Sequence, residues 1–115
     1  MVEDARRRLQ RVEVDDLEAE IAAGALVVDI RPDVNRHEEG SLPGAVVIDR
    51  NVLEWRLDPT SGYHLPEAAA DRRIILFCNE GHASSLAAVT LQDLGLINAT
   101  DLAGGYRAWV AAQRS

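Results

Sequence analysis

The stretch IILFCNEGHASSLAAV, residues 74–89, decides how this chain is interpreted. Its first five residues belong to the segment RRIILFC, 72–78, whose apolar, β-favouring residues predict a buried strand. The segment 84–95 spaces its leucines and alanines as one helical face does and ends at a glycine. The polar connection between strand and helix contains Gly81, and the only cysteine of the chain, Cys78, ends the strand. A strand, a glycine-containing loop and a helix therefore meet at a lone thiol.

Outward from this stretch, short strands and helices alternate along the chain. Apolar runs predict buried strands at 25–30, 45–48 and 99–102, and Leu9 and Val12 indicate a short first strand. Helical spacing predicts helices at 15–24, 50–57 and 104–113 and one turn at 34–39. The turn-rich segment 58–67 is either an ordered or a mobile loop. Such alternation predicts an α/β fold with a parallel sheet between layers of helices.

Length and composition limit the possible functions. We expect one domain, 1–115, in which residues 1–8 are frayed and the arginines at 6–8 form a solvated helix face or a frayed end. The net charge is −7, and all 12 cationic residues are arginine, which disfavours nucleic-acid binding. No apolar run approaches the roughly 20 residues of a membrane span, so we expect no membrane partner. A single cysteine excludes an internal disulfide and a resolving thiol, and a reducing cytoplasm is the expected location.

Cys78 stands where ligands collect in parallel sheets, at the carboxyl end of a strand. If the loop 79–84 curls around the sulfur, its amides and the helix N-terminus stabilise a thiolate, the reactive form of cysteine. Gly81 permits the backbone angles that this needs, and Ser84 is placed to cap the helix. Taken alone, a cysteine that ends an apolar strand is more often a small buried hydrophobic residue.

Four segments together resemble the rhodanese-like domain family. CNEGHAS, 78–84, resembles its Cys-x-x-Gly-x-x-Ser active-site loop, and VVDIRP, 27–32, resembles its Asp-x-Arg segment. EEGSLPGAVVI, 38–48, resembles its Gly-His-Ile-Pro-Gly-Ala segment with Ser41 in place of the histidine, and LAGGYRAW, 102–109, resembles its Gly-Gly-x-x-x-Trp ending. The segments occur in the family's order, so the resemblance covers most of the chain.

The resemblance implies a single-domain rhodanese-like fold with a mainly parallel five-stranded sheet and helices on both faces. It implies a sulfurtransferase in which Cys78 carries sulfane sulfur as a persulfide, taken from thiosulfate or a small-molecule or protein persulfide donor and passed to a thiophilic acceptor. No cofactor and no metal is implied, and the oligomeric state is left open. The expected substrate-binding residues are the loop and one neighbouring arginine: Asn79, Glu80, Gly81, His82, Ala83, Ser84 and Arg31. Asp29 is expected to give structural support as an acceptor of loop amides.

Two loop residues depart from the family pattern and keep an alternative open. Many members carry an arginine where this chain has Ala83, and the charge of Glu80 opposes an anionic donor. His82 or Arg31 can supply the missing cation. A non-catalytic rhodanese-like module that binds or regulates a partner is the alternative function. Phosphatase chemistry is disfavoured because the position that would hold its phosphate-clamping arginine is Ser84.

Overall fold

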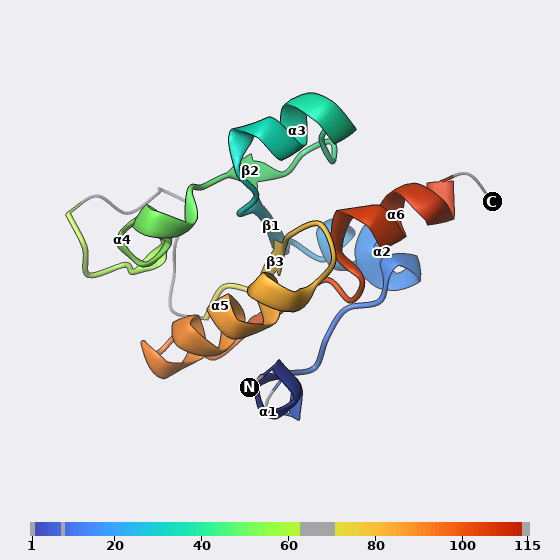
Figure 1. Cartoon of the computed structure of the whole chain (residues 1–115). Coiled ribbons are helices and arrows are strands. Elements are labelled where there is room, and N and C mark those ends of the chain that lie inside the picture. Colours follow the sequence, from blue (N-terminus) through green and yellow to red (C-terminus); the bar gives the residue numbers. More distant parts are fainter. Residues whose placement is uncertain (1, 8, 63–70, 114–115) are drawn as a thin grey trace.

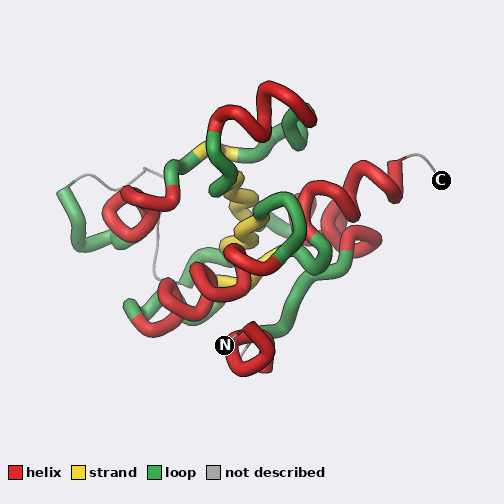
Figure 2. The backbone as a smooth tube through the Cα atoms, in the orientation of Figure 1, coloured by secondary structure: helices red, strands yellow, loops and turns green. Residues whose placement is uncertain are grey.

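The computed structural model describes residues 2–7, 9–62 and 71–113. Its strands are β1 (Leu26–Asp29), β2 (Val46–Val47), β3 (Ile74–Phe77) and β4 (Ala99–Asp101). They pair in the order β2-β1-β3-β4, and every pair is parallel. Helices surround this sheet, as Figures 1 and 2 show. The predicted α/β fold with a parallel sheet is therefore confirmed.

The prediction of five strands is wrong by one in the described part of the chain. The segment near Leu9 and Val12 contributes a single bridge, from Val12 to Leu102 beside β4. The Val12 amide donates to the Asp101 carbonyl at 3.0 Å, and Val12 accepts from the Ala103 amide at 2.8 Å. The chain then turns into the 3-10 helix η1 (Val14–Asp16), which stops the ladder after one residue. Leu9 and Val12 are nevertheless both buried.

The prediction of a buried strand at 45–48 is also corrected. Strand β2 has only Val46 and Val47, and it lies at the edge of the sheet with β1 as its one neighbour. Val46 is half-buried and Val47 is 51% exposed. An apolar run looks the same in a central strand and in an edge strand, so the sequence alone did not separate the two.

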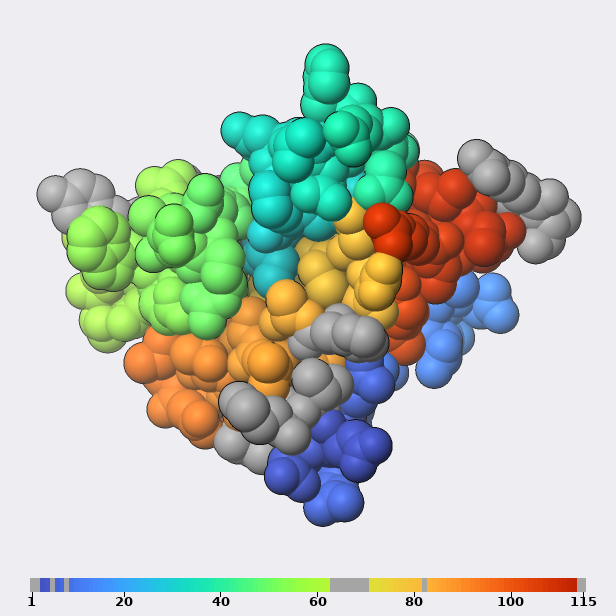
Figure 3. Space-filling model, viewed as in Figure 1, coloured from blue at the N-terminus to red at the C-terminus, as the bar shows by residue number. Residues whose placement is uncertain are grey.

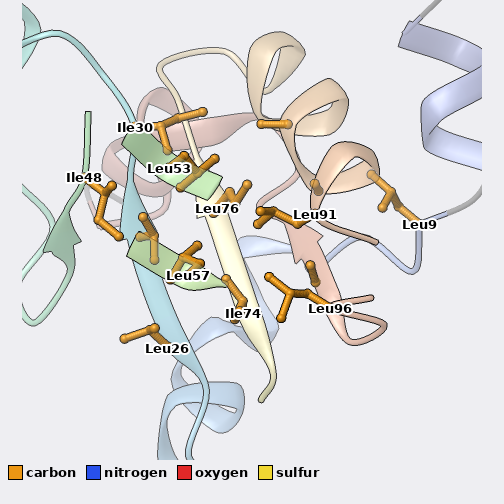
Figure 4. Packing of buried hydrophobic residues seen from close by; sticks show 14 residues of the cluster. Leu9, Leu26, Ile30, Ile48, Leu53, Leu57, Ile74, Leu76, Leu91 and Leu96 are labelled. Atoms are coloured by element: carbon orange, nitrogen blue, oxygen red, sulfur yellow. The ribbon is translucent and has the colours of Figure 1, made fainter. Parts of the chain in front are cut away.

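The two faces of the sheet bury alternate residues of the same strands. Ile74 and Leu76 point into one cluster, which Leu53 and Leu57 of α4 (Leu53–Leu57) and Leu91 of α5 (His82–Asp93) complete (Figure 4). The neighbouring residues of β3 point to the opposite face, where they meet α2 (Leu17–Ala22) and α6 (Gly105–Gln113). These two clusters hold β3 in the centre of the molecule, with its four residues all buried.

The helices from α2 onward follow the predicted segments with shifted ends, whereas residues 2–7, where a frayed end was expected, form a helix that packs on the body. Helix α3 (Asp33–Glu39) is longer than the predicted single turn, and η2 (Arg50–Val52) precedes α4. Helix α5 begins two residues before the predicted start, and helix α1 (Val2–Arg7) packs against it. Part of the predicted loop 58–67 lies outside the described residues. None of the described helices has both the length and the hydropathy that crossing a bilayer would require.

Candidate active site

Cys78 follows the last residue of β3, the strand that β1 and β4 flank. Its side chain is free of any disulfide and half-buried. In Figure 3 the amber surface of the residues around it lies between the teal surface of α3 and the red surface of α6. The thiol is thus at the carboxyl edge of a parallel sheet and within reach of solvent, which is where a reacting group can meet a substrate.

The loop curls back so that a main-chain amide meets the sulfur. Gly81 donates its N–H to Cys78 Sγ at 3.1 Å. Gly81 has a φ of 90°, and a Cβ there would lie 3.1 Å from the Gly104 amide nitrogen. Both the left-handed angle and this close approach favour glycine. A backbone donor held at this distance stabilises negative charge on sulfur, the form in which cysteine attacks.

Ser84 does not cap α5, contrary to the prediction. The helix N-cap is Gly81, without a side-chain cap bond, and Ser84 lies inside the first turn. Its hydroxyl donates to Asp101 Oδ2 at 2.8 Å, and its oxygen lies 3.6 Å from Cys78 Sγ. Asp101 is completely buried, so it attracts the hydroxyl proton more strongly than an exposed acceptor would. Ser84 therefore links the sulfur to the end of β4.

The glycine turn before α6 supports the loop from a second side. The amide of Tyr106 donates to the Cys78 carbonyl at 2.8 Å, and the amide of Arg107 donates to the Asn79 carbonyl at 3.1 Å. A Cβ on Gly105 would lie only 2.3 Å from the Cys78 carbonyl oxygen. Two amides at the start of α6 thus hold the two main-chain carbonyls on which the position of the thiol depends.

The Asp-x-Arg segment supports the loop from a third side. Arg31 is only 3% exposed and forms a two-nitrogen contact with Asp29, in which Nη2 to Oδ2 is 2.8 Å. Asp29 also accepts from the backbone amide of Arg31 at 2.9 Å. The guanidinium lies over the ring of Tyr106, 4.1 Å from its centroid, and donates to Asn79 Oδ1 at 3.2 Å. Arg31 therefore contacts the loop 79–84 through Asn79; contact with a substrate stays a prediction.

The charge of Glu80 has a partner that the sequence did not show. Arg107 is ion-paired with both Glu80 and Glu39, the latter at 3.1 Å, and Asn79 donates to Glu39 Oε2 at 2.9 Å. The hydrogen bond from Arg107 lowers the pKa of Glu39 below its usual value, and the same bond raises the pKa of Arg107. The loop carboxylate of Glu80 is therefore partly neutralised where it faces solvent.

Two predicted site residues remain to be placed. Ala83 is exposed at the mouth of the loop, where a longer side chain would reach solvent. His82 is the first residue of α5, and the position of its side chain lies outside what the structure describes. Among the described residues, no three histidine, cysteine or acidic side chains gather as metal ligands would.

Sequence reasoning missed the buried carboxylate at the end of β4. Asp101 accepts from Ser84, from Ser85 at 2.7 Å and from Arg11 Nε at 2.9 Å. A signal for it was present, because Asp101 is the next-to-last residue of a predicted strand just as Asp29 is, and carboxyl ends of parallel strands meet at one edge. Arg11 had no such signal, since its partner is 90 positions away.

A parallel α/β sheet with a cysteine loop after its central strand defines the class of domain. A sequence model of the rhodanese-like domain family matches residues 13–112, and the chain belongs to this family. It is 29% identical over 100 residues to the thiosulfate sulfurtransferase GlpE of Stutzerimonas stutzeri, covering 87% of this chain and 84% of the relative. It is 31% identical over 84 residues, 73% of this chain, to the adenylyltransferase and sulfurtransferase MOCS3-2 of Zea mays. The chain spans only 17% of the length of that relative and 23% of a yeast counterpart from Meyerozyma guilliermondii.

Solved structures give the same result for the fold. A Rhodopseudomonas palustris protein of unknown function, described as a possible tyrosine phosphatase, superposes with a TM-score of 0.87 at 31% identity, over 97% of this chain and 87% of that one. The human single-domain sulfurtransferase TSTD1 superposes with a TM-score of 0.75 at 26% identity, over 88% of this chain and 95% of that one. The chain therefore has the rhodanese fold over nearly its whole length.

Proposed function

We propose that this protein is a sulfurtransferase whose Cys78 carries sulfane sulfur as a persulfide. The observation that carries the proposal is the 3.1 Å hydrogen bond from the Gly81 amide to a half-buried, unpaired thiol at the rim of the sheet. The names of the Stutzerimonas stutzeri and human relatives support the reaction class. A reducing compartment such as the cytoplasm suits this chemistry, because a free thiol persists there.

The reaction would proceed in two displacement steps at sulfur. First, the Cys78 thiolate attacks the outer sulfur of thiosulfate; a new S–S bond forms, the bond between the two donor sulfurs breaks, and sulfite leaves with the electron pair. With a persulfide donor, the leaving group is the donor's thiolate instead. Second, a thiophilic acceptor attacks the outer sulfur of the Cys78 persulfide, and the Cys78 thiolate is regenerated. The amides of the loop 79–84 would hold the anionic end of the donor.

Intact-mass measurement tests this proposal directly. Incubation with thiosulfate or a polysulfide is expected to add one sulfur atom, and cyanide is expected to remove it. Because the chain has one cysteine, Cys78→Ser is a complete control and should show neither step. A wild-type mass that stays unchanged with every sulfane donor would refute the enzyme and leave the non-catalytic binding module.

Phosphatase activity has a weaker basis, although one structural neighbour is described as a possible tyrosine phosphatase. Cysteine-dependent phosphoryl transfer needs a planar bidentate donor for the phosphoryl oxygens, and arginine supplies it. Ser84 occupies the corresponding position, and its hydroxyl is bonded to Asp101. We therefore expect no hydrolysis of an aryl phosphate above the level of the Cys78→Ser variant.

A further inference from the structure

Two arginines from outside the matched family region reach the back of the active-site loop. Arg6 lies in α1 and Arg11 follows it, and both precede residue 13, where the family match begins. Arg6 Nη2 and Arg11 Nη2 each donate to the Gly81 carbonyl oxygen at 3.2 Å. Helix α1 packs against α5, and Figure 1 shows it beside that helix at the N-terminal end of the chain.

The Gly81 carbonyl belongs to the peptide that starts α5. Ser85 Oγ also lies 2.9 Å from this oxygen, but its single hydroxyl proton is shared with Asp101 Oδ2 at 2.7 Å, so the two guanidinium groups are the full donors to the carbonyl. In a trans peptide the N–H points away from the C=O, so the amide of residue 82 faces the side opposite the two guanidinium groups. Hydrogen bonds from cations at the carbonyl polarise this peptide and make its N–H a stronger donor.

The two guanidinium groups differ in how far their charge is balanced. Arg11 is ion-paired with the buried Asp101, with Nε to Oδ1 at 2.9 Å. Among the described residues, Arg6 donates to neutral acceptors, the Gly81 carbonyl and Ser85 Oγ at 3.4 Å. Arg6 is half-buried, so its charge is screened less than that of a solvated arginine. Positive charge therefore remains behind the loop after Asp101 has been neutralised.

We propose that Arg6 and Arg11 are positioning residues for Cys78, which hold the loop from behind and favour the anionic form of its sulfur. The N-terminal segment then contributes to the active site, although it precedes the residues that match the family model. The proposal rests on the proposed function only in taking Cys78 as the reacting group. The thiol is also near Asp101, which Arg11 balances, and its loop carries Glu80, which Arg107 balances.

Alkylation of the single cysteine by iodoacetamide over a range of pH measures this effect without any sulfur donor. Arg6→Ala is expected to slow alkylation near neutral pH by about threefold to tenfold, because one partly screened charge is removed. Its rate profile should also move to higher pH. Arg6→Lys keeps the positive charge and should recover most of the alkylation rate that Arg6→Ala loses near neutral pH.

Arg7→Ala is the matched control, because Arg7 neighbours Arg6 on α1 and is ion-paired at 3.0 Å with Asp4, with both side chains 76% exposed. This variant also removes one positive charge from α1, but the pH dependence of its alkylation rate should be the same as in the wild type. Equal profiles for the two alanine variants would overturn the proposal. So would an Arg6→Ala variant that reacts more slowly with an unmoved profile, since loss of α1 packing alone would do that. If wild-type protein takes up no sulfur yet the Arg6→Ala profile moves, the proposed function fails and this inference stands.

Discussion

Gly105→Ala should displace the thiol without touching it. A Cβ at this position would lie 2.3 Å from the Cys78 carbonyl oxygen and 2.8 Å from the Asn79 carbonyl oxygen. Ordinary carbon contacts begin near 3.5 Å, so the loop must retreat by roughly 1 Å. These contacts are backbone atoms, which cannot rotate away as a side-chain end can. The φ of 66° at Gly105 adds about 1–2 kcal/mol for any residue with a Cβ.

A shift of that size at a reacting atom reduces a rate by about two orders of magnitude. We therefore expect sulfur loading from thiosulfate, followed by intact mass, to be roughly 100-fold slower in folded Gly105→Ala protein than in the wild type. The hydrogen bond from the Gly81 amide to the sulfur, 3.1 Å in the native loop, should be lost or lengthened at the same time. Thermal unfolding of the same samples fixes a temperature at which the variant is fully folded.

Gly95→Ala separates displacement of the loop from backbone strain. Gly95 has a φ of 101°, so alanine there meets a similar conformational penalty, but no atom lies within 4 Å of its Cβ position. It should lose about 1–2 kcal/mol of stability, as Gly105→Ala does from its backbone angle, and keep its loading rate. If Gly105→Ala loads sulfur as fast as Gly95→Ala, the close approach of the glycine turn does not set the position of Cys78 and this reasoning fails.

Three further predictions concern the core, the ion pairs and the loop mouth. Leu76→Ala, at a completely buried site, should lower the free energy of unfolding by about 2–5 kcal/mol in denaturant titration. Because Arg107 lowers the pKa of Glu39 from 4.5, their pair stabilises the fold above that pH and the benefit disappears as pH falls through the lowered value. Glu39→Gln should therefore lower the melting temperature at neutral pH and approach wild-type behaviour in acid; an equal difference at both would contradict this. Ala83→Arg should lower the KM for thiosulfate by placing a cation at the exposed mouth, and an unchanged KM would point instead to Glu80.

The strand, loop and helix at the site were predictable because their signals are local. The apolar run of β3 and the spacing of α5 lie within one stretch of chain, and the cysteine marks their junction. The edge position of β2 was not predictable, since a two-residue apolar strand carries no sign of how many neighbours it has.

The N-cap role of Ser84 was predicted wrongly because its hydroxyl bonds a residue that is distant in sequence. A serine after a glycine loop favours an N-cap in isolated sequence. In the folded chain the Ser84 hydroxyl instead donates to the carboxylate of Asp101, 17 positions away, at 2.8 Å. Asp101 is itself held by Arg11 from 90 positions away. Contacts between residues so far apart in sequence depend on the order of the strands in the sheet, and a local sequence pattern does not reveal that order.

Two buried carboxylates flank the thiol, and each brings an arginine to the loop. Asp29, 1% exposed, ends β1 on one side of β3, and Asp101, 0% exposed, ends β4 on the other. Their partners Arg31 and Arg11 are bound at 2.8 and 2.9 Å. Arg31 then donates to Asn79 at the start of the loop, and Arg11 donates to the Gly81 carbonyl near its end.

This arrangement explains why the loop can depart from the family pattern and keep its shape. Desolvation offsets most of the attraction within a buried ion pair, so such pairs contribute little net stability compared with apolar packing. Here the two ion pairs fix the positions of the Arg31 and Arg11 guanidinium groups. The sheet holds these groups on either side of Cys78, where one contacts Asn79 and the other contacts the Gly81 carbonyl. The side chains at 80 and 83 point outward from that frame and are exposed. If the protein has the proposed function, changes at 80 and 83 should alter which donor the site accepts while the frame that holds the Cys78 sulfur stays the same.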